Sequence, residues 1–70
     1  MSVDLKEYDR MIIRRNGYFL VGMGEDGHLR WSTSPYDAWH HKKRQYVIRV
    51  AKRVGGKMKI FNPINGRILQ

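Results

Sequence analysis

The dipeptide Asn16-Gly17 constrains the fold of this chain more than any other local feature. It separates two runs rich in β-branched, aromatic and long apolar residues, Arg10–Arg15 and Tyr18–Met23. A two-residue type I′ turn needs a positive φ at both positions, and Asn followed by Gly adopts that conformation at low cost. The two runs are therefore predicted to be the antiparallel strands of one hairpin.

A second turn follows this hairpin. Residues 24–27 read Gly-Glu-Asp-Gly, and residues 28–32 then form a third strand-like segment. Leu29 and Trp31 are two residues apart, so they share one face of an extended strand, and we expect both to lie in the core. The N-terminal half is thus predicted to be a three-stranded meander.

A helical segment is predicted to begin after Ser34-Pro35. Ser34 can accept a hydrogen bond from a backbone N–H, Pro35 suits the first helical position, and Asp37 suits the positive end of the helix dipole. Residues 40–45 are all polar and carry no apolar stripe. This leaves two alternatives, one continuous helix or a short turn that breaks after Trp39 and is followed by the main helix, and we favour the second.

The main helix is predicted over residues 42–54, where a period of 100° per residue separates an apolar side from a basic one. The apolar side holds Tyr46, Val47, Val50, Ala51 and Val54, and the opposite side holds Lys42, Gln45, Arg49, Lys52 and Arg53. Ile48 lies outside the apolar stripe and is either partly exposed or part of a contact surface. Gly55-Gly56 supplies the left-handed residue that ends a helix.

Strand patterning returns at Lys57–Asn62. Met58 and Ile60 alternate with two lysines and are predicted to face inward, whereas Lys57 and Lys59 face outward. Phe61 breaks the alternation and must be covered elsewhere.

Residues 62–66, Asn-Pro-Ile-Asn-Gly, have turn chemistry and lead to a possible short last strand at Arg67–Leu69. The expected order is β-β-β-α-β with this possible addition. Such an order indicates an α+β fold, a small antiparallel sheet with one amphipathic basic helix packed on one face. Residues 10–70 are expected to form a single domain, preceded by a frayed tail over residues 1–9.

Seventy residues are enough for only one domain with a modest core. The chain has no cysteine, so it offers neither a disulfide nor a thiolate metal site, which fits a reducing compartment. Its longest apolar run covers residues 18–21, far short of the roughly 20 residues that span a bilayer, and the N-terminus lacks the layout of a signal peptide. We therefore expect a cytoplasmic location and no membrane partner.

The charges are distributed unevenly along the chain. Residues 1–37 hold five basic and six acidic residues, a net charge of −1, whereas residues 38–70 hold nine basic residues and no acidic one, a net charge of +9. Such an imbalance produces a positive potential over one face of a small protein. An anionic partner is predicted, either nucleic acid or an acidic protein surface.

Three segments carry a resemblance to known proteins: SPYDAW at residues 34–39, VGG at residues 54–56 and FNPINGR at residues 61–67. With the RRNG hairpin and the basic helix, this layout resembles small uncharacterised proteins encoded by bacteriophages and prophages, over roughly residues 10–68. The resemblance implies a compact mixed α/β domain. It also implies a class of genes that includes nucleic-acid-binding accessory factors and inhibitors of host enzymes or host defence, acting in the host cytoplasm. It carries over no site residues.

Basic residues on the helix, on the following strand and at the hairpin tip form the predicted binding site for nucleic acid or an acidic partner, together with one tryptophan. These residues are Lys42, Arg49, Lys52, Arg53, Lys57, Lys59, Arg14, Arg15 and Trp39. The alternative is a solvated face that keeps a small protein soluble. A solvated face normally mixes both signs of charge, which favours the binding interpretation.

Four aromatic residues could stack on bases: Tyr18, Trp31, Tyr36 and Trp39. We expect core packing for most of them, because a domain of this size needs its large side chains inside, and we regard Trp39 as the most open.

No catalytic, cofactor or metal site is predicted. The chain has no nucleophile motif and no phosphate-binding glycine loop, and adjacent histidines such as His40-His41 point about 100° apart on a helix. Three functions therefore remain: a non-catalytic protein that binds nucleic acid or a nucleoprotein, an inhibitor of a host enzyme or defence system acting by protein contact, and a structural homodimer joined through a sheet edge or Ile48.

Overall fold

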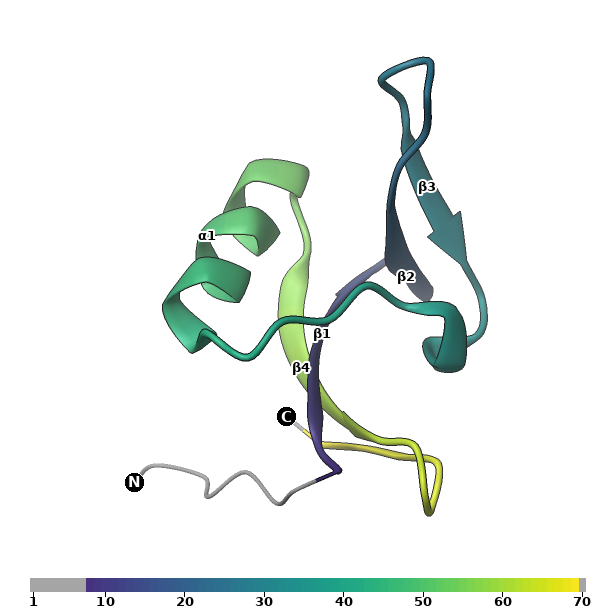
Figure 1. Cartoon of the computed structure of the whole chain (residues 1–70), viewed down its shortest axis with the longest axis vertical. Helices are drawn as coiled ribbons and strands as arrows, with labels where there is room; N and C mark the ends of the chain where they lie inside the picture. The colour runs from purple at the N-terminus through teal and green to yellow at the C-terminus, as the bar shows by residue number, and fades with distance from the viewer. Residues whose placement is uncertain (1–7, 70) are drawn as a thin grey trace.

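The computed structural model describes residues 8–69, which form one antiparallel sheet and a helix packed against it (Figure 1). The elements are β1 (Arg10–Arg15), β2 (Tyr18–Met23), β3 (Leu29–Ser32), the 3₁₀ turn η1 (Pro35–Asp37), α1 (Arg44–Val54), β4 (Lys57–Asn62) and β5 (Arg67–Leu69). The order across the sheet is β3-β2-β1-β4-β5. The predicted α+β fold is confirmed, including the short last strand. The tail predicted for residues 1–9 lies largely outside the described residues.

The first hairpin has the predicted turn. Asn16 has a φ of 51° and Gly17 has a φ of 83°, as a type I′ turn requires. Arg15 lies opposite Tyr18 in the resulting register. The β1–β4 pairing then places a strand from the C-terminal part of the chain beside the N-terminal hairpin.

The outer hairpin differs from the prediction at Leu29. Trp31 is half-buried and packs against the core, but Leu29 is 37% exposed. The pairing is irregular between Leu20 and Gly22, and beyond that point Leu29 pairs with Met23 near the tip of the β2–β3 hairpin. This tip extends past α1, so nothing on the helix covers it (Figure 1). The prediction of a buried Leu29 was therefore wrong.

The helical region is broken, as we favoured. Ser34 Oγ accepts a hydrogen bond from the Tyr36 N–H at 3.3 Å and caps η1. The chain then runs extended, with the Trp39 N–H donating to the Leu20 carbonyl at 2.7 Å and His41 bridging to Met11 of β1. These two tethers to the sheet explain why α1 begins only at Arg44.

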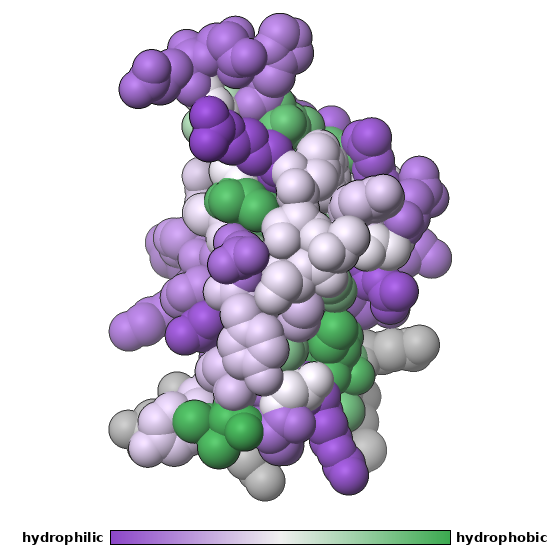
Figure 2. Space-filling view, turned by 90° about the vertical axis from the view of Figure 1, so that its right-hand side faces the viewer, coloured by the Kyte–Doolittle hydropathy of each residue, from purple (hydrophilic) through white to green (hydrophobic). Residues whose placement is uncertain are grey.

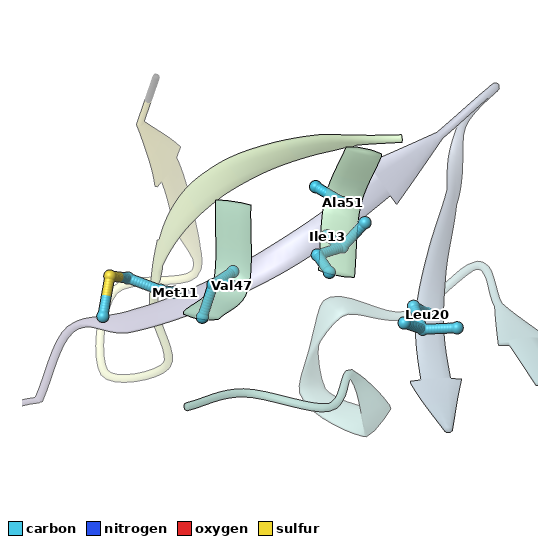
Figure 3. Packing of buried hydrophobic residues seen from close by; sticks show 5 residues of the cluster. All are labelled: Met11, Ile13, Leu20, Val47 and Ala51. Atoms are coloured by element: carbon cyan, nitrogen blue, oxygen red, sulfur yellow. The ribbon is translucent and has the colours of Figure 1, made fainter. Parts of the chain in front are cut away.

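The main core lies between α1 and one face of the sheet. Met11 and Ile13 of β1 and Leu20 of β2 are buried against Val47 and Ala51 of α1 (Figure 3). The helix residues on the predicted apolar side therefore supply the packing, except for Tyr46, which remains 45% exposed. Ile48 is half-buried, in line with its position outside the stripe.

A second cluster covers the other face of β1 and β4. Ile12 and Phe61 are fully buried there with Phe19 and Ala38, and Ile68 of β5 packs against them. The Tyr36 ring meets Phe61 edge-on, with 5.0 Å between the ring centroids. Phe61, which broke the alternation, thus finds its cover from η1 and β5.

The aromatic residues are less buried than expected. Tyr18 is 50% exposed and Tyr36 is 56% exposed, so core packing was a wrong expectation for these two, while Trp31 and Trp39 are half-buried. The view of the β3 and η1 side shows hydrophobic atoms in separate small areas among neutral and hydrophilic ones (Figure 2). Residues of high hydropathy therefore form no continuous patch on this face. Within residues 8–69, no helix combines the length and the hydropathy needed to cross a bilayer.

Candidate functional site

The outer face of α1 is positively charged throughout. Arg44, Arg49, Lys52 and Arg53 are exposed on the helix, and Lys42 and Lys43 are exposed just before it. None of these six cations lies within ion-pair distance of an acidic side chain of residues 8–69. No described carboxylate therefore neutralises these cations by direct contact.

The start of α1 breaks the usual charge rule for helices. Lys43 occupies the N-cap position without a side-chain capping hydrogen bond, and the first turn has no acidic residue. The positive end of the helix dipole thus meets a run of three cations at residues 42–44, each of which costs about 0.3–1 kcal/mol at such a position. Departures of this kind from local preference are typical of functional sites.

An open hollow lies beside this helix start. Its volume is about 630 Å³. The described residues that line it are Trp39, His41, Lys43, Arg44, Gln45, Tyr46 and Arg49. Three of them are cations, three carry aromatic or imidazole rings, and none is acidic. We call this feature the basic aromatic hollow.

The three rings of the basic aromatic hollow form a contiguous cluster. The His41 and Tyr46 ring centroids are 4.7 Å apart, and the Trp39 centroid is 6.0 Å from each of the other two. Trp39 and His41 are nearly parallel, with 27° between their planes, and Tyr46 is inclined to Trp39 by 67°. The rings therefore pack against one another, and the exposed part of Tyr46 lies on the outer surface of the cluster.

A backbone hydrogen bond fixes the orientation of His41. Its Nδ1 accepts from the Lys43 N–H at 3.0 Å. Nδ1 of the neutral ring is therefore unprotonated, and Nε2 carries the hydrogen and remains a donor.

The strand cations predicted for the same surface lie elsewhere. In the β1–β4 register Lys57 is directly opposite Arg14 and Lys59 is directly opposite Ile12. Residues opposite one another share a sheet face, and Ile12 belongs to the face away from α1. The structure therefore separates Lys57, Lys59 and Arg14 from the helix cations.

Arg15 has a structural partner. Its Nη1 donates to the carbonyl of Val54, the last residue of α1, at 2.9 Å. Its guanidinium carbon lies 4.7 Å from the centroid of the Trp31 ring. Arg15 thus satisfies a carbonyl at the negative end of the helix, where a cation is favourable. It lies on the α1 side of the sheet, and its neighbour Arg14 lies on the other side.

Two ionisable groups outside the hollow have shifted pKa values. Slight burial of the otherwise exposed His40 and the nearby positive charge of Arg10 lower the pKa of this histidine below its usual 6.5. Hydrogen bonds from the His28 backbone and side chain lower the pKa of Asp26 in the β2–β3 turn. Across residues 8–69, no three histidine or acidic side chains are grouped so that they could hold a metal ion.

The predicted site thus divides into three parts. Arg49 and Trp39 line the hollow, Lys42, Lys52 and Arg53 belong to the adjoining helix surface, and the hairpin and β4 cations lie elsewhere.

Lys43, Arg44, Tyr46 and His41 were not among the predicted site residues. The spacing Trp39-x-His41 on an extended segment places both rings on one side, but the sequence predicted only a break after Trp39 and gave no conformation for the segment that follows it.

Comparisons with known proteins give no assignment. No protein-family model matches the chain. No curated protein and no solved structure matches it either. The function must therefore be inferred from the geometry of the site itself.

Proposed function

We propose that this protein binds nucleic acid through the basic aromatic hollow and the adjoining cationic face of α1. The observation that carries the proposal is the composition of the hollow, whose described lining residues include three cations, three rings and no acidic side chain. Cations bind the phosphates, and rings offer surfaces for bases. The occurrence of both in one place distinguishes a binding site from a merely solvated face.

The position of the cations supports the same proposal. Lys43 and Arg44 oppose the helix dipole, so they lower the stability of the free protein. A phosphate at this end of α1 reverses the sign of that interaction, because it faces both the cations and the positive end of the dipole. The helix surface with Lys52 and Arg53 extends the positive potential away from the hollow.

The test is a titration of labelled single- and double-stranded oligonucleotides, followed by fluorescence anisotropy at about 50 to 200 mM salt. The site variant is Arg44→Glu/Arg49→Glu. The matched control is Arg14→Glu/Lys57→Glu, which makes the same change in net charge on the other sheet face and leaves a like-charged pair across β1 and β4.

We expect the wild type to bind with a steep salt dependence. The site variant should lose affinity and, on a single strand, reduce the slope of log K against log salt by about 1.4, which corresponds to two phosphate contacts. The control should retain most of its affinity and slope. Equal losses in the two variants would show that net charge, rather than this site, determines binding.

A substitution at the start of α1 also distinguishes an effect on binding from an effect on folding. Glu at the position of Arg44 favours the dipole, so Arg44→Glu should raise the melting temperature slightly while it weakens binding. Loss of binding by an intact protein is the expected result. If no oligonucleotide binds at the lowest salt, the proposal is overturned, and an acidic protein surface becomes the partner class to examine.

A further inference from the structure

The ring cluster of the basic aromatic hollow defines the form of nucleic acid that it can accept. We propose, building on the function proposed above, that the hollow takes one unpaired nucleobase together with its neighbouring phosphate, so that the protein selects single-stranded over double-stranded nucleic acid.

The exposed ring surface provides the base contact. Tyr46 is 45% exposed and stands inclined to the nearly parallel pair of Trp39 and His41. Ring centroids 4.7–6.0 Å apart leave no room for a base between the rings, so a base stacks on the exposed outer surface of the cluster, and every base has a flat face for such a contact. The volume of about 630 Å³ is comparable to that of sites for small organic groups, and the hollow is open to solvent on one side.

Phosphate donors surround the same space. Lys43, Arg44 and Arg49 line the hollow, and the Nε2–H of His41 is a further donor because its Nδ1 is occupied. The first turn of α1 has no side-chain cap. Its backbone N–H groups therefore add to the positive potential at the point where a phosphate next to the stacked base would lie.

Double-stranded nucleic acid cannot use this arrangement fully. A paired base is stacked inside the duplex and reaches a protein pocket only by flipping out, which costs a few kcal/mol. The cations can still contact the phosphates of a duplex, but the rings gain nothing from it. The single strand therefore gains the additional ring contact.

A second, smaller hollow serves as an internal comparison. It has a volume of about 300 Å³ and is lined by Arg15, Asn16, Tyr18 and Trp31. Arg15, the cation among its described lining residues, already bonds the carbonyl of Val54 and packs on Trp31. The described lining of this hollow thus has two rings, Tyr18 and Trp31, but no cation that lacks a partner within the protein. We therefore assign the base contact to the larger hollow.

The experiment compares Tyr46→Ala with the matched control Tyr18→Ala. Both tyrosines are about half exposed, and each lines one of the two hollows. Binding of one oligonucleotide sequence is measured as a single strand, as a duplex, and in competition with a free nucleoside monophosphate. Tyr46→Phe retains the ring and serves as the conservative variant.

We expect the wild type to favour the single strand. Tyr46→Ala should weaken single-strand binding by about 5- to 150-fold, the loss of one base–aromatic stack, and leave duplex binding nearly unchanged. Tyr46→Phe and Tyr18→Ala should both bind like the wild type. In the Trp31→Phe variant the remaining tryptophan reports on the hollow, and its fluorescence should be quenched by the single strand.

Several outcomes would overturn this inference while the proposed function stands. They are equal affinity for single strand and duplex, equal losses in Tyr46→Ala and Tyr18→Ala, or a free nucleoside monophosphate that fails to displace the strand even in large excess. Failure of every oligonucleotide to bind would overturn the proposed function as well. The two failures are therefore distinguishable.

Discussion

Arg15 and Arg14 are adjacent arginines with different roles, which makes their comparison a sharp test of the structure. Arg15 bonds the carbonyl at the end of α1 at 2.9 Å and lies 4.7 Å from the Trp31 ring. Arg14 lies on the other sheet face, directly opposite Lys57. Arg15→Ala and Arg14→Ala remove the same side chain and the same charge, so they differ only in these surroundings.

The expected loss for Arg15→Ala has two parts. A cation at a helix C-terminus contributes about 0.3–1 kcal/mol, and an exposed arginine over an aromatic ring contributes about 0.5–1 kcal/mol. Together they give about 1–2 kcal/mol. For a domain of this size that corresponds to a fall in melting temperature of roughly 4–16 °C.

The expected loss for Arg14→Ala is much smaller. Its guanidinium lies 5.8 Å from the Phe19 ring, near the limit of a cation–π contact. Its removal also relieves the repulsion of Lys57 across the strands, which is worth a few tenths of a kcal/mol. These effects oppose each other, so the free energy of unfolding should change by less than about 0.5 kcal/mol.

Thermal and urea unfolding followed by circular dichroism would measure both variants at equal protein concentration. Arg15→Lys serves as an intermediate case, because lysine retains the charge but lacks the planar fork that serves the carbonyl and the ring together. We expect the wild type to be the most stable of the three proteins, Arg15→Lys to be intermediate and Arg15→Ala to be the least stable. Equal melting temperatures for Arg15→Ala and Arg14→Ala would refute the role assigned to Arg15.

Three other changes test the remaining parts of the fold. Phe61→Ala should lower the free energy of unfolding by about 3–5 kcal/mol in urea titrations, because Phe61 is fully buried. Ile64→Ala, at a position that is 71% exposed, should change this free energy by less than about 0.5 kcal/mol. Similar losses in the two variants would contradict the second core. Gly56→Ala should cost about 1–3 kcal/mol in the same assay, because its Cβ would lie 2.8 Å from the Ile13 Cγ2, and a neutral effect would contradict that close approach. His40 has a pKa below the usual 6.5 in the folded protein, so the unfolded state binds more protons, and the stability present above about pH 6.5 is lost as the pH falls. Melting temperatures measured from about pH 7 to pH 5 should therefore decline less in His40→Asn than in the wild type. Parallel curves for the two proteins would contradict this linkage.

Local signals predicted most of the secondary structure because each depends on only a few neighbouring residues. Asn16-Gly17 sets a turn through its own backbone preferences, and Gly55, with a φ of 75°, ends α1 in the left-handed conformation. The strand at Lys57–Asn62 and the break before the main helix follow from patterns of similarly short range. Such features need no knowledge of what packs against them.

The candidate site was only partly predictable, because its members meet through tertiary contacts. Trp39 and His41 reach the hollow only because the Leu20 carbonyl and Met11 hold residues 39–41 extended along the sheet. Tyr46 joins them from the first turns of α1.

The amino-acid sequence by itself determined the elements, the antiparallel hairpins and the absence of acidic residues after position 37. The tertiary structure alone decided which cations act together. It placed Lys57 on the sheet face away from α1, tied Arg15 to the end of the helix, and gathered Arg44 and Arg49 beside the rings. The physical reason is that charge and backbone preference belong to a residue and its immediate neighbours, whereas a shared surface depends on strand register and on the path of the chain between η1 and α1.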